Sequence, residues 1–284
     1  MTICDLNIVS NELFTHPNKY IIIKKLGTGA HSICYEVKCC NDNNNYACKI
    51  YPNKSSLSKI IKRECEIHKS LPHHNNIVKW YGYYQTANYI YMFLELCDSG
   101  SLYDLSLKHT FEIEEIRSYM NQLVIALKFL HNENNIVHRD LKLGNIVLNS
   151  DNDHPIKKKI KLIDFSFATK CANKQKLKDM LGTPNYVAPE ILNKSEYDYG
   201  VDIWAVGIIL YTLLIGKPPF ETGTVKETYE RILRCEYTWP VNKDVDIGAK
   251  NLVTQILRLN PNERLDLSGI ENHEFLKFSP TIDV

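Results

Sequence analysis

The sequence predicts an α+β fold in which a β-rich first third precedes a mainly helical remainder. Up to about residue 95, short runs of β-branched and aromatic residues alternate with polar turns, and beyond that point apolar residues recur at helical spacing. The 284-residue chain is 44% hydrophobic and 24% charged, which is the composition of an ordinary globular protein. A wholly disordered chain and a small disulfide-stapled fold are therefore excluded.

Five strands are expected in the first third, each bounded by turn-forming residues. They cover residues 20–26, 33–38, 46–51, 77–83 and 89–95. One helix is expected over residues 58–70, because Ile60, Ile61 and Ile67 fall on one helical face together with His68. Glu64 lies on the same face, so this helix is expected to present a carboxylate inward.

The remainder of the chain is expected to be helical, with the change falling at residues 97–100. Helices are expected over residues 112–131 and 201–214, and a short strand over 161–163. The most apolar stretch, residues 203–215, is shorter than the roughly 20 residues needed to cross a bilayer. It predicts a buried helix, and no membrane contact is expected.

The charge balance gives no reason to expect a nucleic-acid or membrane partner, because 34 basic and 33 acidic residues leave a net charge of +1. The nine cysteines include no C-x-x-C pair and no cluster with histidine at zinc spacing, which favours reduced thiols. The N-terminus lacks a basic segment followed by an apolar run. Together these features predict a protein of the cytoplasm, the nucleus or both.

A glycine-rich turn and a strand lysine are the first features that suggest chemistry. Gly27 and Gly29 lie between two expected strands, which suits a backbone that approaches phosphate closely, although an ordinary hairpin turn has the same pattern. A dinucleotide-binding fingerprint is disfavoured because a strand follows these glycines instead of a helix. Lys49 lies in an apolar strand and needs an anionic partner, for which Glu64 is the candidate; the alternative is a lysine that reaches the surface.

The segment 138–145, HRDLKLGN, combines the three kinds of group that phosphoryl transfer requires. Asp140 offers an acceptor for a hydroxyl proton, Lys142 a positive charge, and Asn145 an oxygen ligand for magnesium. Asp164, at the end of the expected short strand, offers a second hard oxygen ligand. A glycosidase with paired carboxylates is a poorer interpretation, because Lys142 and Asn145 have no obvious role in one.

With these residues in place, the chain resembles a eukaryotic protein kinase catalytic domain over about residues 20–278. Lys142 and the segment 182–186, GTPNY, resemble the serine/threonine branch. Cys34 at the end of the glycine-rich loop, LELC at 94–97 and GTPNYVAPEIL at 182–192 resemble polo-like kinases. The other features shared with kinases are Lys49, Glu64, HRDLKLGN, Asp164, Glu190 in the APE tripeptide, Asp202 with Trp204 and Gly207, and Arg264.

The resemblance implies a two-lobed fold around a shared cleft, forming a single catalytic domain. Residues 1–96 are expected to form a small β-rich lobe, and residues 97–284 the hinge and a larger helical lobe. It also implies a monomeric, ATP-dependent serine/threonine kinase that uses Mg²⁺ and acts on proteins with Ser or Thr acceptors. The chain ends twenty residues past Arg264, so no polo-box domain is expected in it.

The same resemblance implies a role for each candidate residue. Asp140 is expected to be the catalytic base and Lys142 the charge stabiliser, with Lys49 and Glu64 also catalytic. Asn145 and Asp164 are expected to bind the metal, and Glu190 and Arg264 to form a structural ion pair. ATP is expected to be held by Leu26, Gly27, Thr28, Gly29, Ala30, His31, Ser32, Ile33, Cys34, Ala47, Lys49, Leu94, Glu95, Cys97 and Val147.

Two departures from the kinase pattern bear on regulation. Ser166 replaces the glycine of Asp-Phe-Gly, so we expect reduced access to the state in which Phe165 is flipped outward. Asp179 stands where polo-like kinases carry an activating phosphothreonine. It could partly replace that charge beside Arg139, or it could be one more charge in a loop. Residues 132–135 are not basic, so the acidic substrate preference of polo-like kinases is not carried over.

Two other functions are compatible with the same fold. A pseudokinase would bind nucleotide and serve as a scaffold, and a small-molecule kinase would share the nucleotide site. The presence of Lys49, Asp140, Asn145 and Asp164 together favours an active enzyme over a pseudokinase. The segment 182–190, which resembles a peptide-docking segment, favours a protein substrate over a small molecule.

Overall fold

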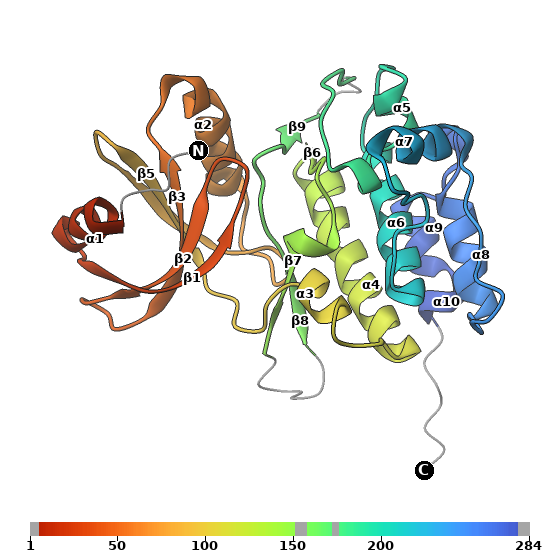
Figure 1. The fold of residues 1–284 in the computed structure, drawn as a ribbon, viewed down its shortest axis with the longest axis horizontal. Helices are drawn as coiled ribbons and strands as arrows, with labels where there is room; N and C mark the ends of the chain where they lie inside the picture. Colours follow the sequence, from red (N-terminus) through yellow and green to blue (C-terminus); the bar gives the residue numbers. More distant parts are fainter. Residues whose placement is uncertain (1–5, 151–157, 172–175, 278–284) are drawn as a thin grey trace, which may run out of the picture. The chain divides into compact units, whose positions relative to one another are not determined.

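The computed structural model describes residues 6–150, 158–171 and 176–277, and the chain divides into two compact units, Met1–Asp98 and Ser99–Val284. The first unit contains a five-stranded antiparallel sheet with the order β1-β2-β3-β5-β4 (Figure 1). Its strands are β1 (Tyr20–Thr28), β2 (Ile33–Cys39), β3 (Asn45–Pro52), β4 (Trp80–Gln85) and β5 (Tyr89–Glu95). The second unit is mainly helical, so the predicted α+β fold is confirmed.

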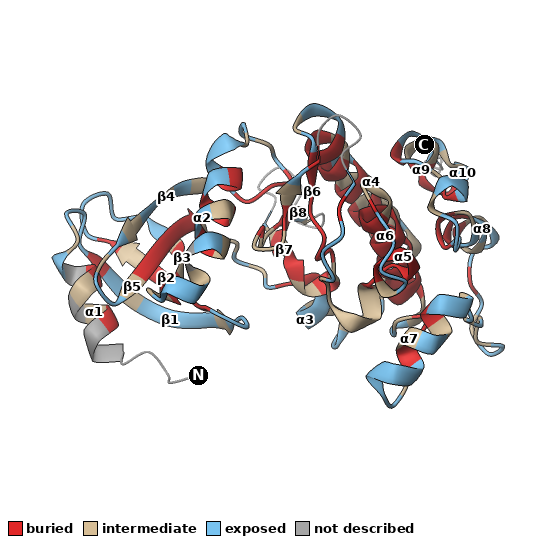
Figure 2. Ribbon diagram, turned by 90° about the horizontal axis from the view of Figure 1, so that it is seen from above, coloured by how far each residue is buried: buried red, intermediate tan, exposed pale blue. Residues whose placement is uncertain are grey.

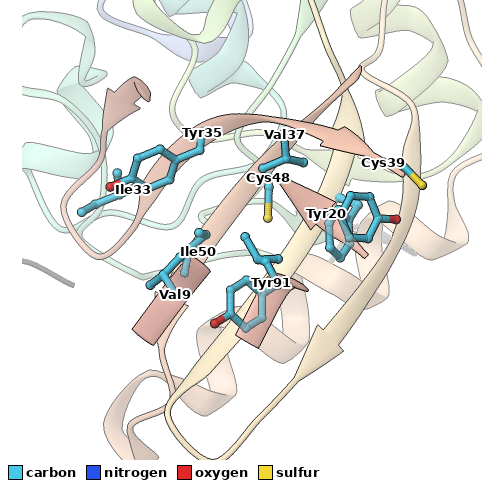
Figure 3. Packing of buried hydrophobic residues seen from close by; sticks show 11 residues of the cluster. Val9, Tyr20, Ile33, Tyr35, Val37, Cys39, Cys48, Ile50 and Tyr91 are labelled. Atoms are coloured by element: carbon cyan, nitrogen blue, oxygen red, sulfur yellow. The ribbon is translucent and has the colours of Figure 1, made fainter. Parts of the chain in front are cut away.

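The two faces of the sheet bury different residues. Tyr35 of β2, Cys48 of β3 and Tyr91 of β5 point to one face and pack in a buried cluster with Val9 of helix α1 (Leu6–Thr15), as Figure 3 shows. Val9 and Leu13 of α1 have no exposed surface. Because side chains alternate along a strand, Lys49 and its neighbours in register point to the other face.

Helix α1 was not expected from the sequence. It is stabilised by docking, because the Glu12 carboxylate accepts hydrogen bonds from Thr86 (2.7 Å), Asn88 (2.8 Å) and Tyr91 (2.5 Å). These partners lie more than 70 residues away in the sequence, at the turn between β4 and β5 and in β5. A local pattern of apolar residues could not have indicated such contacts.

Helix α2 (Ser55–Ser70) begins three residues before the predicted start and connects β3 with β4. Its inward face includes Ile61, Glu64 and His68, all buried, so the predicted inward carboxylate is confirmed. Strand β4 begins three residues later than predicted. Ile77 lies instead in a turn, where its N–H donates to the carbonyl of His74 at 3.2 Å.

The second unit is built around helices α4 (Ile113–Lys128) and α6 (Gly200–Ile215). Figure 2 shows α6 as buried along nearly its whole length, and residues 201–214 are all buried. At Gly207 an added Cβ would lie 2.8 Å from the side chains of Ile256 and Leu257. Glycine therefore allows these two side chains to pack closely against α6. The predicted helix 112–131 is present as α4 followed by a π-helix, Phe129–Glu133.

The remaining elements of the second unit are short, and several have polar caps. Thr224, Asp246 and Asp266 each accept a hydrogen bond from the backbone of the helix that follows. These bonds fix where α7 (Val225–Arg234), α8 (Ile247–Ile256) and α9 (Leu267–Asn272) begin. Among the described helices, none combines the length and apolar character needed to span a bilayer. The other elements are α3 (Leu102–Ser106), β6 (Ile136–Val137), a 3₁₀ turn (Leu143–Asn145), β7 (Ile146–Asn149), β8 (Lys159–Leu162), β9 (Thr169–Lys170), a 3₁₀ turn (Pro184–Tyr186), α5 (Pro189–Leu192), a 3₁₀ turn (Pro261–Glu263) and α10 (Glu274–Lys277).

Candidate active site

The glycine-rich segment forms the hairpin between β1 and β2. Thr28 pairs with Ile33 at the end of the ladder, and the N–H of Gly29 donates to the carbonyl of Ser32 at 2.8 Å. An added Cβ on Gly27 would meet nothing within 4 Å, so this backbone is open to a ligand. A Cβ on Gly29 would lie 3.2 Å from Ser32 Oγ, which makes this turn tight.

Four of the candidate ATP residues, Cys34, Ala47, Lys49 and Leu94, share one face of the sheet. Ile33 and Glu95 lie in register with Ile50 and Tyr46, so they point to the other face, and Ile33 packs in the cluster with α1. Cys34 is paired with Lys49, and Ala47 with Leu94. Ala47 and Leu94 are buried, so they offer an apolar surface of the kind that receives a flat aromatic ring. This face is the one opposite α1.

Lys49 of β3 and Glu64 of α2 form the predicted ion pair, with Lys49 Nζ 2.9 Å from Glu64 Oε1. Glu64 has no exposed surface and the Lys49 side chain is 13% exposed, so the pair is largely removed from water. A buried carboxylate is stable only when its oxygens have donors. The interpretation of Lys49 as a lysine that merely reaches the surface is therefore wrong.

The candidate catalytic base in the second unit is held by three side chains. Asp140 Oδ1 accepts a hydrogen bond from Thr183 Oγ1 (2.7 Å), and Oδ2 accepts from Lys142 Nζ (2.6 Å) and Asn145 Nδ2 (3.0 Å). Lys142 Nζ also donates to Thr183 Oγ1 at 2.9 Å. Asp140 is 5% exposed, so these donors fix the plane of its carboxylate.

Asn145 and Asp164 fit the requirements of a magnesium site. The Asn145 side-chain amide donates to Asp140, which leaves its Oδ1 as an oxygen ligand. The carbonyl of Asn145 accepts a hydrogen bond from Ile163 N–H at 3.0 Å, which keeps the neighbouring Asp164 close. Among described residues no three Asp, Glu, His or Cys side chains form a metal cluster. Two protein oxygen ligands suffice for Mg²⁺ when substrate phosphates and water molecules fill the other positions of its octahedral coordination.

Asp202 of α6 holds the backbone of the segment 138–145, which is called the catalytic loop below because it carries the candidate base. Its carboxylate accepts hydrogen bonds from the N–H groups of His138 and Arg139, both at 2.8 Å, and lies 2.8 Å from His131 Nε2. Arg139 has a φ of 69°, a left-handed conformation that needs such support. Burial alone raises the pKa of Asp202, but these hydrogen bonds and the nearby imidazoles outweigh burial and lower it.

The Arg139 side chain joins the catalytic loop to the segment that carries Asp179. Its Nη1 donates to Asp179 Oδ2 (2.7 Å) and to Tyr197 Oη (3.1 Å), and its Nε donates to the carbonyl of Phe167 (2.7 Å). The remaining nitrogen, Nη2, is buried without a hydrogen-bond partner. The contact expected between Asp179 and Arg139 is present, and the carboxylate satisfies only part of the guanidinium.

The other expected positions lie as follows. Phe165 is fully buried against His138, and Ser166 N–H donates to Asp164 Oδ1 at 3.3 Å. Glu190 and Arg264 form the predicted ion pair through two 2.7 Å contacts.

The candidate site residues are gathered within each unit, in two sets. The first unit holds residues 26–34 in the β1–β2 hairpin, Ala47, Lys49, Glu64, Leu94, Glu95 and Cys97. The second unit holds Asp140, Lys142, Asn145, Val147 of β7 and Asp164. Glu95 closes β5, and its N–H donates to the carbonyl of Lys79 at 2.9 Å.

Two supporting residues were not assigned a site role from the sequence. Thr183 was noted only as part of a serine/threonine-type segment, and Asp202 only as part of the shared pattern. Thr183 bonds Asp140 across 43 residues, and Asp202 bonds Arg139 across 63 residues. Their place in a family pattern was the only sequence signal, because no local spacing links them to the catalytic loop.

Comparison with known proteins identifies a protein kinase domain and relatives named as serine/threonine kinases. The protein kinase domain family model matches residues 20–276. The chain is 42% identical over 262 residues to a probable serine/threonine-protein kinase PLK of Dictyostelium discoideum, an alignment that covers 90% of this chain and 26% of that protein. It is 40% identical over 266 residues to the serine/threonine-protein kinase polo of Drosophila melanogaster (92% and 44% covered). It is 38% identical over 263 residues to the serine/threonine-protein kinase PLK1 of Xenopus tropicalis (90% and 42% covered).

The match to the family model includes both units and nearly all the residues discussed above. The chain spans from about a quarter to less than half of the length of these three relatives. This chain therefore belongs to the protein kinase domain family, and it is similar in sequence to the polo-type serine/threonine kinases.

Proposed function

We propose that this chain is an ATP-dependent serine/threonine kinase that transfers the γ-phosphoryl group of ATP to Ser or Thr hydroxyls of proteins. The observation that carries the proposal is the setting of Asp140, which is buried and oriented by Thr183, Lys142 and Asn145. Such a carboxylate, with a lysine beside it and magnesium ligands nearby, suits in-line transfer to a hydroxyl. The relatives named as serine/threonine kinases support the same reaction.

In the proposed reaction the substrate hydroxyl oxygen bonds to the γ-phosphorus, and the bond from that phosphorus to the bridging oxygen of ADP breaks. Asp140 accepts the hydroxyl proton. ADP, released when the bond to the bridging oxygen breaks, is the other product. Lys142, 2.6 Å from Asp140 Oδ2, neutralises charge on the transferred group. Lys49, held by Glu64, binds the phosphates of ATP.

The ligands proposed for ATP are the β1–β2 hairpin, Ala47, Leu94, Glu95 and Cys97 of the first unit and Val147 of the second unit. Asn145 and Asp164 hold Mg²⁺, which offsets phosphate charge when bound.

Asp179 is proposed to replace, in part, an activating phosphate. A carboxylate carries one negative charge, against about 1.5–2 for a phosphate, and has fewer acceptor oxygens. The pairing of Asp179 with Arg139 Nη1 and the partnerless Nη2 are both consistent with a partial replacement. Ion pairs from Lys176 to Asp198 and from Lys178 to Glu196 (3.0 Å) also hold the same segment.

The remaining parts of the proposal concern partners and place. We expect this chain to act as a monomer on protein substrates, in the cytoplasm, the nucleus or both. No nucleic-acid partner is expected from a chain whose net charge is +1.

The direct test is transfer of labelled phosphate from ATP to a library of Ser- and Thr-containing peptides. Wild-type protein is expected to label peptides, and Asp140→Asn to reduce kcat at least about a hundredfold, because the proton acceptor is lost. Tyr211→Phe serves as a control, since Tyr211 lies in α6 and its hydroxyl donates to the carbonyl of Thr238 at 2.6 Å, away from Asp140 in the sequence and outside the proposed site. Equal labelling by wild type and Asp140→Asn would refute the assignment of the base.

A further inference from the structure

Tyr51 lies two residues after Lys49 in β3, so both side chains point to the same face of the sheet. Its strand neighbour in β5 is Ile90, and the pairing of β3 with β2 ends one residue earlier, at Ile50. The Tyr51 side chain is 3% exposed. A buried phenol needs a hydrogen-bond partner, and here the partner is the carboxylate of the ion pair.

Tyr51, Lys49 and Glu64 contact one another in all three combinations. Tyr51 Oη donates to Glu64 Oε2 at 2.6 Å, while Lys49 Nζ donates to the other oxygen, Oε1, at 2.9 Å. The Lys49 ammonium lies 5.3 Å from the centroid of the Tyr51 ring, within the range of a cation–π contact. Each oxygen of the fully buried carboxylate therefore has its own donor.

From this arrangement we infer that Tyr51 is a positioning residue for phosphoryl transfer, which keeps the Glu64 carboxylate and the Lys49 ammonium in the orientation that binds nucleotide phosphates. The inference rests on the proposed kinase function. Neither Glu64 nor Lys49 alone fixes this orientation, because one hydrogen bond lets a carboxylate rotate about its contact. A second donor on the other oxygen removes that freedom and adds a contact between α2 and β3.

The chemistry of the phenol suits this role. Burial raises the pKa of Tyr51 well above its usual range, so the hydroxyl remains a donor at any pH at which the protein works. Without the hydroxyl, Glu64 Oε2 would be buried beside an apolar ring edge and would lose a charge-assisted hydrogen bond. Hydration of this oxygen would require α2 to move away from β3.

The test compares Tyr51→Phe with Tyr211→Phe. Each substitution removes one buried phenol oxygen that donates at 2.6 Å, but Tyr211 lies in the second unit and bonds a backbone carbonyl. We expect Tyr51→Phe to lower kcat five- to tenfold with less than a twofold change in the KM for peptide, and Tyr211→Phe to leave both unchanged. Activities are compared at a temperature at which circular dichroism shows every variant to be folded.

A double-mutant cycle separates positioning from general loss of stability. In the Glu64→Gln background the carboxylate is absent, so adding Tyr51→Phe is expected to change kcat by less than twofold. An equal loss in both backgrounds would overturn the inference, because Tyr51 would then act independently of Glu64. Wild-type activity in Tyr51→Phe would overturn it as well.

Hydrogen exchange supplies a readout that does not depend on turnover. The amides of α2 are expected to exchange at least fivefold faster in Tyr51→Phe than in Tyr211→Phe, while those of α6 are unchanged in Tyr51→Phe. Unchanged exchange in α2 would contradict the inference. If the wild type transferred no phosphate, the proposed function would fail, and this comparison would still decide whether Tyr51 orients Glu64.

Discussion

A single buried guanidinium links the catalytic loop with the segment that carries Asp179. Arg139 is held at its backbone by Asp202 and at its Nε by Phe167, so its position does not depend on Asp179. Asp179 is 59% exposed at its side chain, whereas Arg139 has no exposed surface there. The acidic partner is thus the adjustable member of the pair.

Replacing Asp179 tests whether the carboxylate supports activity. In unphosphorylated protein, Asp179→Ala is expected to lower kcat about three- to tenfold, because a half-exposed ion pair contributes about 1 kcal/mol. Asp244→Ala, which removes another exposed carboxylate from the same unit, is the matched control and is expected to retain wild-type kcat. The measurement is steady-state phosphorylation of a Ser/Thr peptide. Equal rates in the two variants would refute the proposal that Asp179 partly replaces an activating phosphate.

How well each site residue could be predicted depends on how far along the sequence its partners lie. Asp140, Lys142 and Asn145 fall within six positions, so a single segment predicted them together. Lys49 and Glu64 lie 15 residues apart on a strand and the next helix, and the need of a buried lysine for an anion was enough to pair them. The hydroxyl of Tyr51 could not be predicted in the same way, because an aromatic residue in a strand is expected for packing alone.

At the scale of elements, α1 has the most definite energetic consequence. It covers the sheet face opposite Lys49 with the side chains of Val9 and Leu13. Burial of apolar surface by a helix this short must outweigh the cost of ordering it, since isolated helices of ten residues are unstable in water. Its contribution is therefore to the stability of the first unit.

Truncating Leu13 measures that contribution. Leu13→Ala is expected to reduce the free energy of unfolding by about 3 kcal/mol, the usual cost of removing a fully buried leucine side chain. Leu107→Ala is the control, since Leu107 is 66% exposed and its loss is expected to cost less than about 0.5 kcal/mol. Urea unfolding followed by tryptophan fluorescence compares the two, and similar midpoints would show that α1 does not pack on the sheet in solution.

The whole molecule carries 17 tyrosines, many of them buried, and this makes its stability sensitive to alkali. Burial raises the pKa of Tyr119 to about 12 and that of Tyr51 well above the usual value. Burial, together with the hydrogen bond to Glu12, also raises the pKa of Tyr91. In the unfolded chain such groups lose their protons near pH 10.

The sign of the pH dependence follows from these directions. Above about pH 10 the unfolded state binds fewer protons than the folded state, so the free energy of unfolding falls as the pH rises. We expect the urea midpoint to begin to decrease near about pH 8.5, where thiols such as Cys65, whose pKa burial raises to about 11, lose their protons in the unfolded chain. The tyrosines are expected to steepen this decrease from about pH 10 towards pH 12 and above.

Two tyrosine variants isolate this effect from the titration of lysines and cysteines. Tyr119→Phe is expected to lessen the alkaline decrease in midpoint, and Tyr83→Phe, at a site that is 56% exposed, to leave it unchanged. Tyrosinate absorbance is expected to rise together with the loss of circular dichroism. Ionisation of most tyrosines in the still folded protein would contradict the account.

The fold class was predictable because it depends on periodicity, and Lys49, Glu64, Asp140, Lys142, Asn145 and Asp164 were proposed as site residues from their chemistry. Apart from the glycine-rich turn, the other candidate site residues were proposed only from the resemblance to protein kinases. The five strands and helices α2, α4 and α6 each have a clear apolar pattern. Two features could not be predicted from the sequence. One is the packing of α1 on the sheet, which depends on segments far apart in the chain, and the other is the turn ending at Ile77, after which β4 begins later than expected. The change from α-helix to π-helix at Phe129 is likewise a matter of hydrogen-bond geometry that composition does not encode.

The alternation along β3 also limits how this protein can change length. Cys48 and Ile50 belong to the cluster beneath α1, while Lys49 and Tyr51 face Glu64. Adding or deleting one residue upstream within β3 would exchange the two sets and turn the lysine into the apolar cluster. The exposed turn at residues 41–44 has no such constraint. Insertions and deletions should therefore survive in that turn and be eliminated from the adjoining strand.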